Sequence, residues 1–267
     1  MAGVTAVEYL WRTVIESFSE YQLKTIVTFV IHESFYWGSY LPFLLFESIS
    51  FFQRWKLQPE KRTDTPMLKN CVARLLVNHF LLVFPIIMFT HPVMDLMGAD
   101  HSVETLPTPS FILFQLFLFF LIEDFVFYWG HRALHTPYLY KKVHHIHHEH
   151  SAPFGLAAEY AHPLEVVFLG AATLAGPMLF APHLLTLYIY LALRCIQTVE
   201  CHSGYDFPWS LNRWFPLYGG AHFHDHHHRI HSGNYSSTFT WVDALFGTDN
   251  AFQAWRRKRQ LAKSAKD

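Results

Sequence analysis

The sequence predicts an all-α integral membrane protein, and three observations support this fold class. Of the 267 residues, 51% are hydrophobic and 15% are charged, whereas soluble domains carry roughly 25% charged residues. The apolar residues fall in long runs rather than on one helical face, which disfavours a soluble enzyme with a large core. Histidine is unusually frequent, and 15 of the 20 histidines lie in the stretches 131–162 and 202–231. We therefore expect about three to four membrane-spanning helices, a helical hairpin and a histidine-rich helical cap.

The chain is expected to form a single membrane-embedded domain over residues 1–267. Its first residues show no signal-peptide pattern, because charged residues interrupt every apolar run there. Apolar stretches suited to crossing a bilayer lie at about 24–46, 72–97 and 110–130. The expected segments are a lead-in at 1–23, transmembrane helices within 24–130, two histidine motifs within 131–163, the hairpin at 164–200, a third histidine motif within 201–250 and a basic tail at 251–267.

The distribution of charge predicts which side of the membrane the histidines occupy. The 47–70 loop is basic and the 91–109 loop is acidic, so the positive-inside rule places 47–70 in the cytosol. Pro177 and Pro182 interrupt the apolar region 164–200, which predicts a hairpin that enters and leaves on one side. Both histidine stretches then reach the cytosolic face. The basic tail agrees with that side, either as a binder of anionic headgroups or as a solvated helix.

Three motifs repeat histidine at helical spacing. Residues three or four apart share one helix face, so such imidazoles can bind one metal ion or two adjacent ions. We expect each HxxHH triplet to form one patch of ligands. The motif residues are His131 and His135; His144, His147 and His148; and His224, His227 and His228. His202, which follows the hairpin, is a ninth candidate, and His162 and His222 remain open. Isolated histidines such as His32 and His79 are expected to be ordinary surface or core residues.

Nine imidazoles are too many for one ion and suit two ions with four or five ligands each. Nitrogen ligands indicate iron, copper, zinc or nickel rather than calcium or magnesium. Carboxylates near the motifs are expected to orient the histidine rings, or to cap helices: Glu159, Glu165, Glu200 and Asp225. Three cysteines without paired spacing predict neither disulfides nor a zinc knuckle, and a net charge of −1 gives no indication of nucleic-acid binding.

Iron with open coordination positions can react with dioxygen and oxidise an unactivated C–H bond, which no protein side chain can do. The sequence has no GxGxxG fingerprint and no haem-attachment motif, so electrons would have to come from a partner. The alternative class is a non-catalytic metal-binding or metal-transport protein. Transport would favour ionisable residues along the spans, whereas these histidines cluster where the spans end.

Four further segments accompany the histidine motifs: EDFVFYWGHRALH, APFGLAAEYAHPLE, VECHSGYDFPWS and GNYSSTFTWVDALFGTD. On these segments the chain, over roughly residues 25–250, resembles the fatty acid hydroxylase and sterol desaturase superfamily of membrane non-haem di-iron enzymes. Within that superfamily it looks most like the sterol 4-methyl monooxygenases. The extra His222 and His226 depart slightly from the third motif of the family and leave its ligand set open.

The resemblance implies a multi-pass enzyme of the endoplasmic reticulum membrane whose active site faces the cytosol. Such an enzyme uses two iron ions and dioxygen to oxidise a sterol 4-methyl group through alcohol and aldehyde to carboxylate. Electrons come from NAD(P)H through cytochrome b5 and its reductase, and other enzymes of sterol 4-demethylation are expected partners beside membrane lipid. The nine histidines would be the iron ligands. Preference for 4-methyl or 4,4-dimethyl sterols stays open, as do iron or zinc occupancy and another lipid hydroxylase or desaturase activity.

Overall fold

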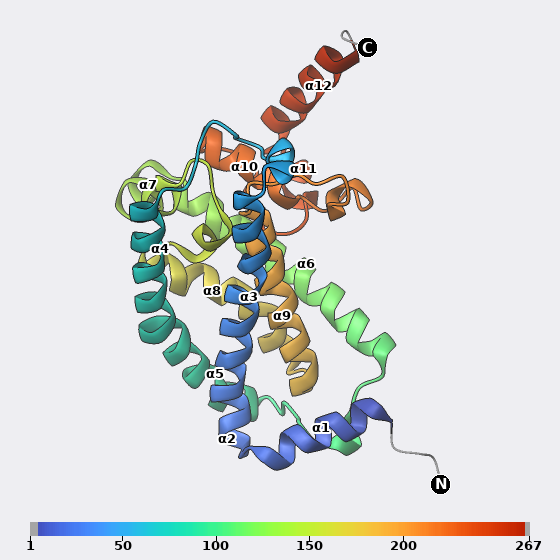
Figure 1. The fold of residues 1–267 in the computed structure, drawn as a ribbon. Coiled ribbons are helices and arrows are strands. Elements are labelled where there is room, and N and C mark those ends of the chain that lie inside the picture. Colours follow the sequence, from blue (N-terminus) through green and yellow to red (C-terminus); the bar gives the residue numbers. More distant parts are fainter. Residues whose placement is uncertain (1–4, 265–267) are drawn as a thin grey trace.

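The computed structural model describes residues 5–264, and the elements of this described part are all helices, joined by turns and loops (Figure 1). The N-terminal half contains α1 (Ala6–Ser17), α2 (Glu20–Gln22), η1 (Leu23–Val27), α3 (Thr28–Ser48), η2 (Ser50–Trp55), α4 (Thr65–Asn78), η3 (His79–Val83), α5 (Phe84–Leu96) and η4 (Val103–Thr105). The C-terminal half contains α6 (Pro109–Leu134), α7 (Pro137–Lys142), η5 (His144–Glu149), η6 (Gly155–Glu159), α8 (Pro163–Phe180), α9 (Leu184–Cys201), η7 (Leu211–Arg213), α10 (Gly220–Ile230), α11 (Trp241–Phe246) and α12 (Asn250–Ser264).

Four helical stretches in the described residues are long and apolar enough to cross a membrane: Thr65–Leu96, which joins α4, η3 and α5, and α6, α8 and α9. α6 presents side chains such as Phe114 and Phe117 to the outside, as lipid contact requires. α3, which occupies most of the stretch 24–46 expected to cross the bilayer, is not among the four, so that expected span is not supported. It packs along α9 and carries His32 and Glu33. The expected all-α membrane fold class is therefore confirmed.

The long helices run between two ends of the molecule. At one end, here called the histidine end, lie α7, η5 and α10, and α12 projects from it (Figure 1). At the opposite end lie α1 and the 97–108 segment, where the Trp11 Nε1–H donates to the carbonyl of His101 over 2.9 Å. Both predicted histidine stretches therefore reach the same end. Residues 1–4 of the lead-in and 265–267 of the basic tail lie outside the described residues.

The predicted hairpin consists of α8 and α9, which are joined by a turn at 181–183. Pro177 lies inside α8, and the break falls at Ala181, whose φ of 38° is left-handed. α8 packs mainly on α6, whereas α9 packs mainly on α3. Gly176 allows the close α6–α8 approach, since a Cβ there would lie 2.9 Å from the Cα of Phe119.

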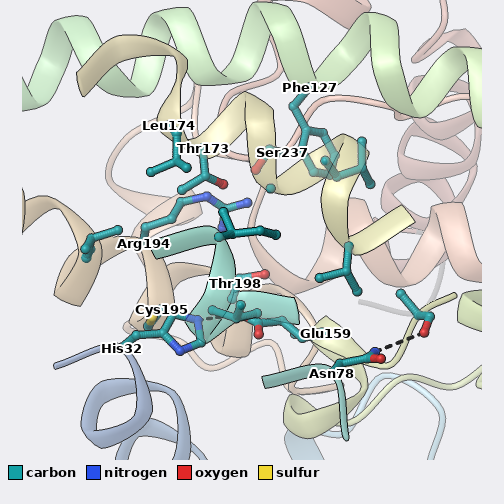
Figure 2. Close-up of a pocket in the computed structure, with 18 of the residues that line it drawn as sticks. His32, Asn78, Phe127, Glu159, Thr173, Leu174, Arg194, Cys195, Thr198 and Ser237 are labelled. Atoms are coloured by element: carbon teal, nitrogen blue, oxygen red, sulfur yellow. Dashed lines mark hydrogen bonds and ion pairs between the residues drawn. The ribbon is translucent and has the colours of Figure 1, made fainter. Parts of the chain in front are cut away.

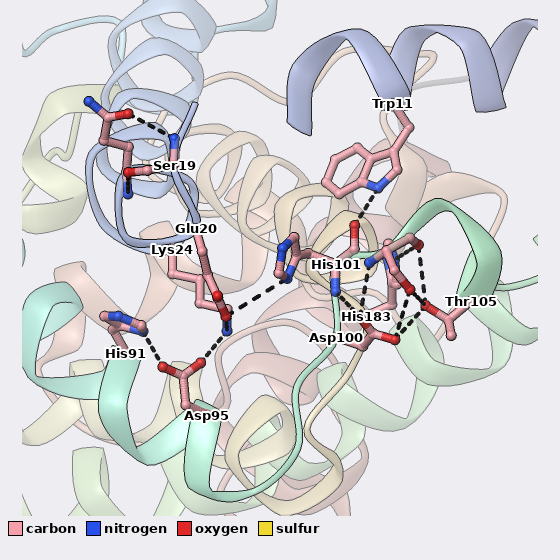
Figure 3. A network of polar contacts seen from close by, with 12 residues as sticks. Trp11, Ser19, Glu20, Lys24, His91, Asp95, Asp100, His101, Thr105 and His183 are labelled. Atoms are coloured by element: carbon pink, nitrogen blue, oxygen red, sulfur yellow. Dashed lines mark hydrogen bonds and ion pairs between the residues drawn. The ribbon is translucent and has the colours of Figure 1, made fainter. Parts of the chain in front are cut away.

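A polar network fixes the opposite end (Figure 3). The Lys24 ammonium pairs with Asp95 of α5 and, at 2.6 Å, with Glu20. His91 Nδ1 lies 3.0 Å from the second oxygen of Asp95. The hairpin turn is held in the same region, because His183 Nε2 lies 3.0 Å from the carbonyl of Ser102. These contacts tie η1 to α5, and the start of α9 to the 97–108 segment.

Candidate metal centre

The nine histidines chosen from the sequence converge at the histidine end in two groups. His131, His135, His144, His148 and His227 form the first group, and His147, His202, His224 and His228 form the second. Within each group the offered ligand atoms all lie within 4.8 Å of one another. Eight of the nine side chains are buried, and His135 is the partly exposed one. The structure thus brings together every histidine that the motifs indicated.

Each HxxHH motif contributes to both groups, so the expectation that each triplet forms one patch is wrong. His144 and His148 belong to the first group, while His147 between them belongs to the second. The third motif has the reverse arrangement, because His224 and His228 join the second group and His227 joins the first. In each motif the residues four apart share one group and the third residue points to the other. The two groups therefore lie side by side, and η5 and α10 serve both.

The spacing of the ring nitrogens suits ligands that share a cation. Seven pairs of Nε2 atoms lie 2.8–3.4 Å apart, all within one group or the other. A neutral imidazole that keeps its proton on Nδ1 has only a lone pair on Nε2, and facing lone pairs repel. Ligands on an ion with metal–nitrogen distances of about 2.1 Å lie about 3.0–3.4 Å apart. The spacing therefore fits two transition-metal ions.

The other ring nitrogen is held by the surrounding protein. Backbone carbonyls accept from Nδ1 in four of the nine rings: Tyr235 for His131 at 2.8 Å, Tyr160 for His147 at 3.2 Å, Thr198 for His202 at 2.8 Å and Gly233 for His227 at 2.7 Å. A carboxylate serves a fifth ring, because Glu165 Oε1 lies 2.8 Å from His144 Nδ1. Such partners fix the tautomer and leave Nε2 as the ligand atom.

Burial keeps these rings in the neutral form that binds metal. Burial, reinforced by neighbouring imidazoles, holds the pKa values of His144, His147 and His148 well below their usual range. The same causes lower the pKa values of His224, His227 and His228. Burial lowers the pKa of His202 to about 3. The rings are thus ready to donate lone pairs at neutral pH, and metal binding would not have to displace their protons.

Of the four carboxylates expected to orient histidine rings, Glu165 touches one of the nine. Glu200 accepts from the Tyr218 hydroxyl at 2.7 Å. Asp225 accepts from the Gln58 amide at 2.8 Å and pairs with Arg229 at 3.0 Å. Glu159 contacts His32 and His79. Burial alone would raise the pKa of Glu159, but these two histidines hold it below the usual range.

Two aspartates that the motif analysis missed support the loop behind the first group. Asp124 Oδ1 accepts from the backbone N–H groups of Ser237, Thr238 and Phe239 at 3.1, 2.8 and 3.1 Å. Asp243 accepts from those of Tyr235 and Ser236 at 2.8 and 2.7 Å. The segment 235–239 is thereby fixed, and with it the Tyr235 carbonyl that orients His131. The sequence signal was that Asp124 lies in an apolar helix, where an ionisable residue is energetically costly and therefore indicates a specific role.

Gly233 supplies the carbonyl that orients His227, and no other residue fits there. Its φ is +69°, and a Cβ at this position would lie 2.3 Å from the carbonyl oxygen of Thr248.

The two histidines that the sequence left open as ligands, His162 and His222, lie apart from both groups. The ring of His222 packs against Phe252 and Trp255, and His162 caps α8 by accepting from the Leu164 N–H at 3.1 Å.

An apolar cavity of about 200 Å³ begins at the histidine groups and extends towards the opposite end. Its wall includes rings from both groups, among them His131 and His202, and reaches Lys24 and Met94. Leu174, Phe127 and Thr173 form apolar and weakly polar parts of the wall, with Arg194, Thr198 and Glu159 among the polar ones (Figure 2). Arg194 is neutralised by Glu123 of α6, 3.1 Å away. The mainly apolar lining suits the body of a lipid next to a metal centre.

The fold and site define a class: a membrane-embedded helical protein with a histidine-rich centre suited to two metal ions. Comparison with known proteins narrows this class. The fatty acid hydroxylase family matches residues 116–248, which include all nine histidines. The chain is 49% identical over 255 residues to "Very-long-chain aldehyde decarbonylase GL1-11" of Oryza sativa subsp. indica, covering 94% of this chain and 95% of that protein.

Two similar proteins from Arabidopsis thaliana carry a different name. "Methylsterol monooxygenase 2-2" is 48% identical over 250 residues, covering 92% of this chain and 93% of that protein. "Methylsterol monooxygenase 2-1" is 46% identical over 262 residues, covering 92% and 96%. No solved structure matches the chain. The chain belongs to the fatty acid hydroxylase family and is an oxidoreductase, as its resemblance to that superfamily predicted.

Proposed function

We propose that this protein is a membrane-bound non-haem di-iron monooxygenase that oxidises a 4-methyl group of a sterol precursor to alcohol, aldehyde and then carboxylate. The observation that carries the proposal is the convergence of nine Nε2 atoms, in groups of five and four, on an apolar cavity. Relatives at 46–48% identity named methylsterol monooxygenase support the substrate class. The first group would hold one ion and the second group the other.

Two bound iron ions would supply the reaction with dioxygen that oxidises a methyl group. The protein's own residues would bind the metal ions and orient the substrate. The buried rings provide neutral ligands, and the carbonyls of Tyr160, Thr198, Gly233 and Tyr235 hold these rings in place. The apolar wall of the cavity excludes water from the substrate. Electrons derive from NAD(P)H and arrive through cytochrome b5 and its reductase, and other enzymes of sterol 4-demethylation consume the product.

A reconstitution experiment tests this function. Purified protein in lipid, supplied with iron and a cytochrome b5 electron-transfer system, is expected to convert 4-methyl or 4,4-dimethyl sterols to 4-carboxy products only in the presence of oxygen. Product analysis by mass spectrometry and iron determination check the outcome. The naming of relatives at 49% identity favours one second candidate, the decarbonylation of very-long-chain aldehydes. Such aldehydes belong in the same assay, and turnover of aldehydes without any sterol oxidation would replace our proposal.

The protein is proposed to lie in the endoplasmic reticulum membrane with its histidine end in the cytosol. Asn234-Tyr235-Ser236 is a glycosylation sequon. It cannot report this orientation, because Asn234 is 1% exposed and its amide donates to the Phe223 carbonyl at 2.8 Å. Acceptor sequons inserted at exposed positions beside Glu104 and Glu60 are better placed, since these lie at the opposite end and at the histidine end. We expect glycosylation beside Glu104 alone, seen as a mobility shift that glycosidase removes. Glycosylation beside Glu60 would show that the orientation is the reverse of the proposed one.

A further inference from the structure

A third polar cluster lies in the wall of the cavity, apart from the two histidine groups. His32 and Glu33 come from α3, His79 from the π-helical turn η3, and Glu159 from the end of η6. His79 Nδ1 lies 2.8 Å from Glu33 Oε1, and His79 Nε2 lies 2.8 Å from Glu159 Oε2. His32 repeats this pattern, with Nδ1 3.0 Å from Glu33 Oε1 and Nε2 3.3 Å from Glu159 Oε1. The four residues form a closed ring of ion pairs, here called the quartet.

The quartet differs chemically from the metal groups. In the metal groups the close contacts join nitrogen to nitrogen, whereas in the quartet each of these four contacts joins a nitrogen to a carboxylate oxygen. Carboxylates beside both nitrogens of an imidazole favour its charged imidazolium form. His32, Glu33 and His79 also lie close enough together to hold a metal ion. Two imidazolium rings and two carboxylates are neutral together, however, so the charges of the quartet balance without one. Its carboxylates keep free lone pairs, because each carboxylate can accept about four hydrogen bonds.

Neighbouring side chains hold the quartet rigidly. The Trp37 indole donates to Glu33 Oε2 at 2.8 Å. The Tyr36 hydroxyl accepts from the Glu159 backbone N–H at 3.3 Å and donates to the Leu156 carbonyl at 2.9 Å. The π-helical turn at His79 is a local irregularity of a kind that is frequent at functional sites. A purely structural ion-pair ring would not need to line a cavity, yet this one does.

The quartet turns its accessible side towards the cavity. His32, His79 and Glu159 all line the cavity, and His32 and Glu159 lie on the same wall in Figure 2. His79 is fully buried, whereas the side chain of Glu159 is 25% accessible. A ligand in the cavity can therefore reach Glu159. Elsewhere much of the wall is apolar, so Glu159 offers a strong acceptor to a hydroxyl group there.

One member of the quartet, Glu159, is also linked to the metal centre through its neighbour in the chain. Glu159 directly precedes Tyr160, whose carbonyl orients His147 of the second group. In a sterol the carbon that bears the hydroxyl is bonded to the carbon that bears the 4-methyl group. A residue that binds this hydroxyl must therefore lie near the metal ions when the methyl group faces them. The position of Glu159 satisfies this requirement.

We propose that the quartet binds the 3-hydroxyl group of the substrate, with Glu159 as the acceptor, and so positions the 4-methyl group at the metal centre. This inference rests on the proposed function. The quartet then determines specificity for lipids in which the carbon that bears a hydroxyl group is bonded to the carbon that bears the oxidised methyl group.

The test compares a 4-methylsterol with its 3-O-methyl ether, which lacks the donor hydrogen. The wild-type enzyme is expected to prefer the free hydroxyl by roughly 10- to 100-fold in kcat/KM, the range of a hydrogen bond to a charged group. Glu159→Gln is expected to reduce this preference to about threefold or less. Its iron content should not change. The matched control is Glu47→Gln, since Glu47 pairs with Lys56 and does not line the cavity; it should keep the full preference.

Two results would overturn the inference: a wild-type enzyme that does not discriminate between the two sterols, or a Glu159→Gln enzyme with normal iron that discriminates as well as wild type. If Glu159→Gln does not fold, His32→Gln replaces it. Binding measured as a thermal shift with each sterol gives a readout without turnover. A wild-type protein that is stabilised selectively by the sterol with the free hydroxyl group, but oxidises no sterol, would refute the proposed function. It would still support the binding of the hydroxyl group by the quartet.

Discussion

Replacing His144 with alanine is expected to abolish turnover and to remove the ion of the first group. His144 is fully buried, and its Nε2 lies 3.0 Å from that of His131 and 3.2 Å from that of His148. Loss of an outer partner of a metal ligand typically costs 10- to 100-fold in activity or affinity, so loss of the ligand should cost more than roughly 100-fold. Iron per chain, measured by mass spectrometry of the purified protein, should fall from two to about one.

His145 provides the matched control because it is the next residue in the chain and is exposed. His145→Ala should keep both ions and full turnover. His224→Ala, in the second group, should lose the other ion. All three variants should still be extracted from membranes only by detergent, because the spans are untouched. Retained turnover and two ions in a folded His144→Ala protein would contradict the assignment of the first group.

Local spacing was sufficient to find the histidines, because residues three or four apart on a helix necessarily lie close together. The positions of charged loops and of Pro177 and Pro182 likewise predicted that both stretches reach one end. Spacing could not show how the ligands divide between the groups, since the splitting of His144 and His148 from His147 depends on partners far away in the chain. Whether these groups hold iron stays a prediction.

The residues that support the metal centre and the cavity wall could not be predicted from the sequence for the same reason. Glu159 lies near the second histidine motif in the chain, yet its partners are His32 and His79. Neither histidine has a motif around it, and His32 was reasonably expected to be an ordinary residue. Gly233 and Asp124 act through backbone groups, which leave no pattern of side chains in the sequence. Long-range pairings of this kind follow from the packing of α3, α6 and α9 rather than from local propensity.

Removal of the Asp124 carboxylate is expected to have the largest effect on stability. Asp124→Ala would leave the backbone N–H groups of Ser237, Thr238 and Phe239 without their acceptor. Each buried donor left unsatisfied costs roughly 1–3 kcal/mol. Because the contacts of Ser237 and Phe239 are only partly buried, the variant should lose on the order of 3–5 kcal/mol of unfolding free energy, the lower part of the summed range. Because the same loop carries the Tyr235 carbonyl that orients His131, the variant should also bind iron more weakly.

Asp124→Asn separates the hydrogen bonds from the charge. The amide keeps a carbonyl oxygen in the place of Oδ1, so it can still accept from the three N–H groups, and it should lose only about 1 kcal/mol. Denaturant unfolding in detergent, with and without iron, measures both variants. The order wild type, Asn, Ala would show that the acceptor oxygen holds the loop behind the first group. Equal stability of the Asn and Ala variants would show instead that the negative charge of Asp124, rather than its acceptor geometry, matters there.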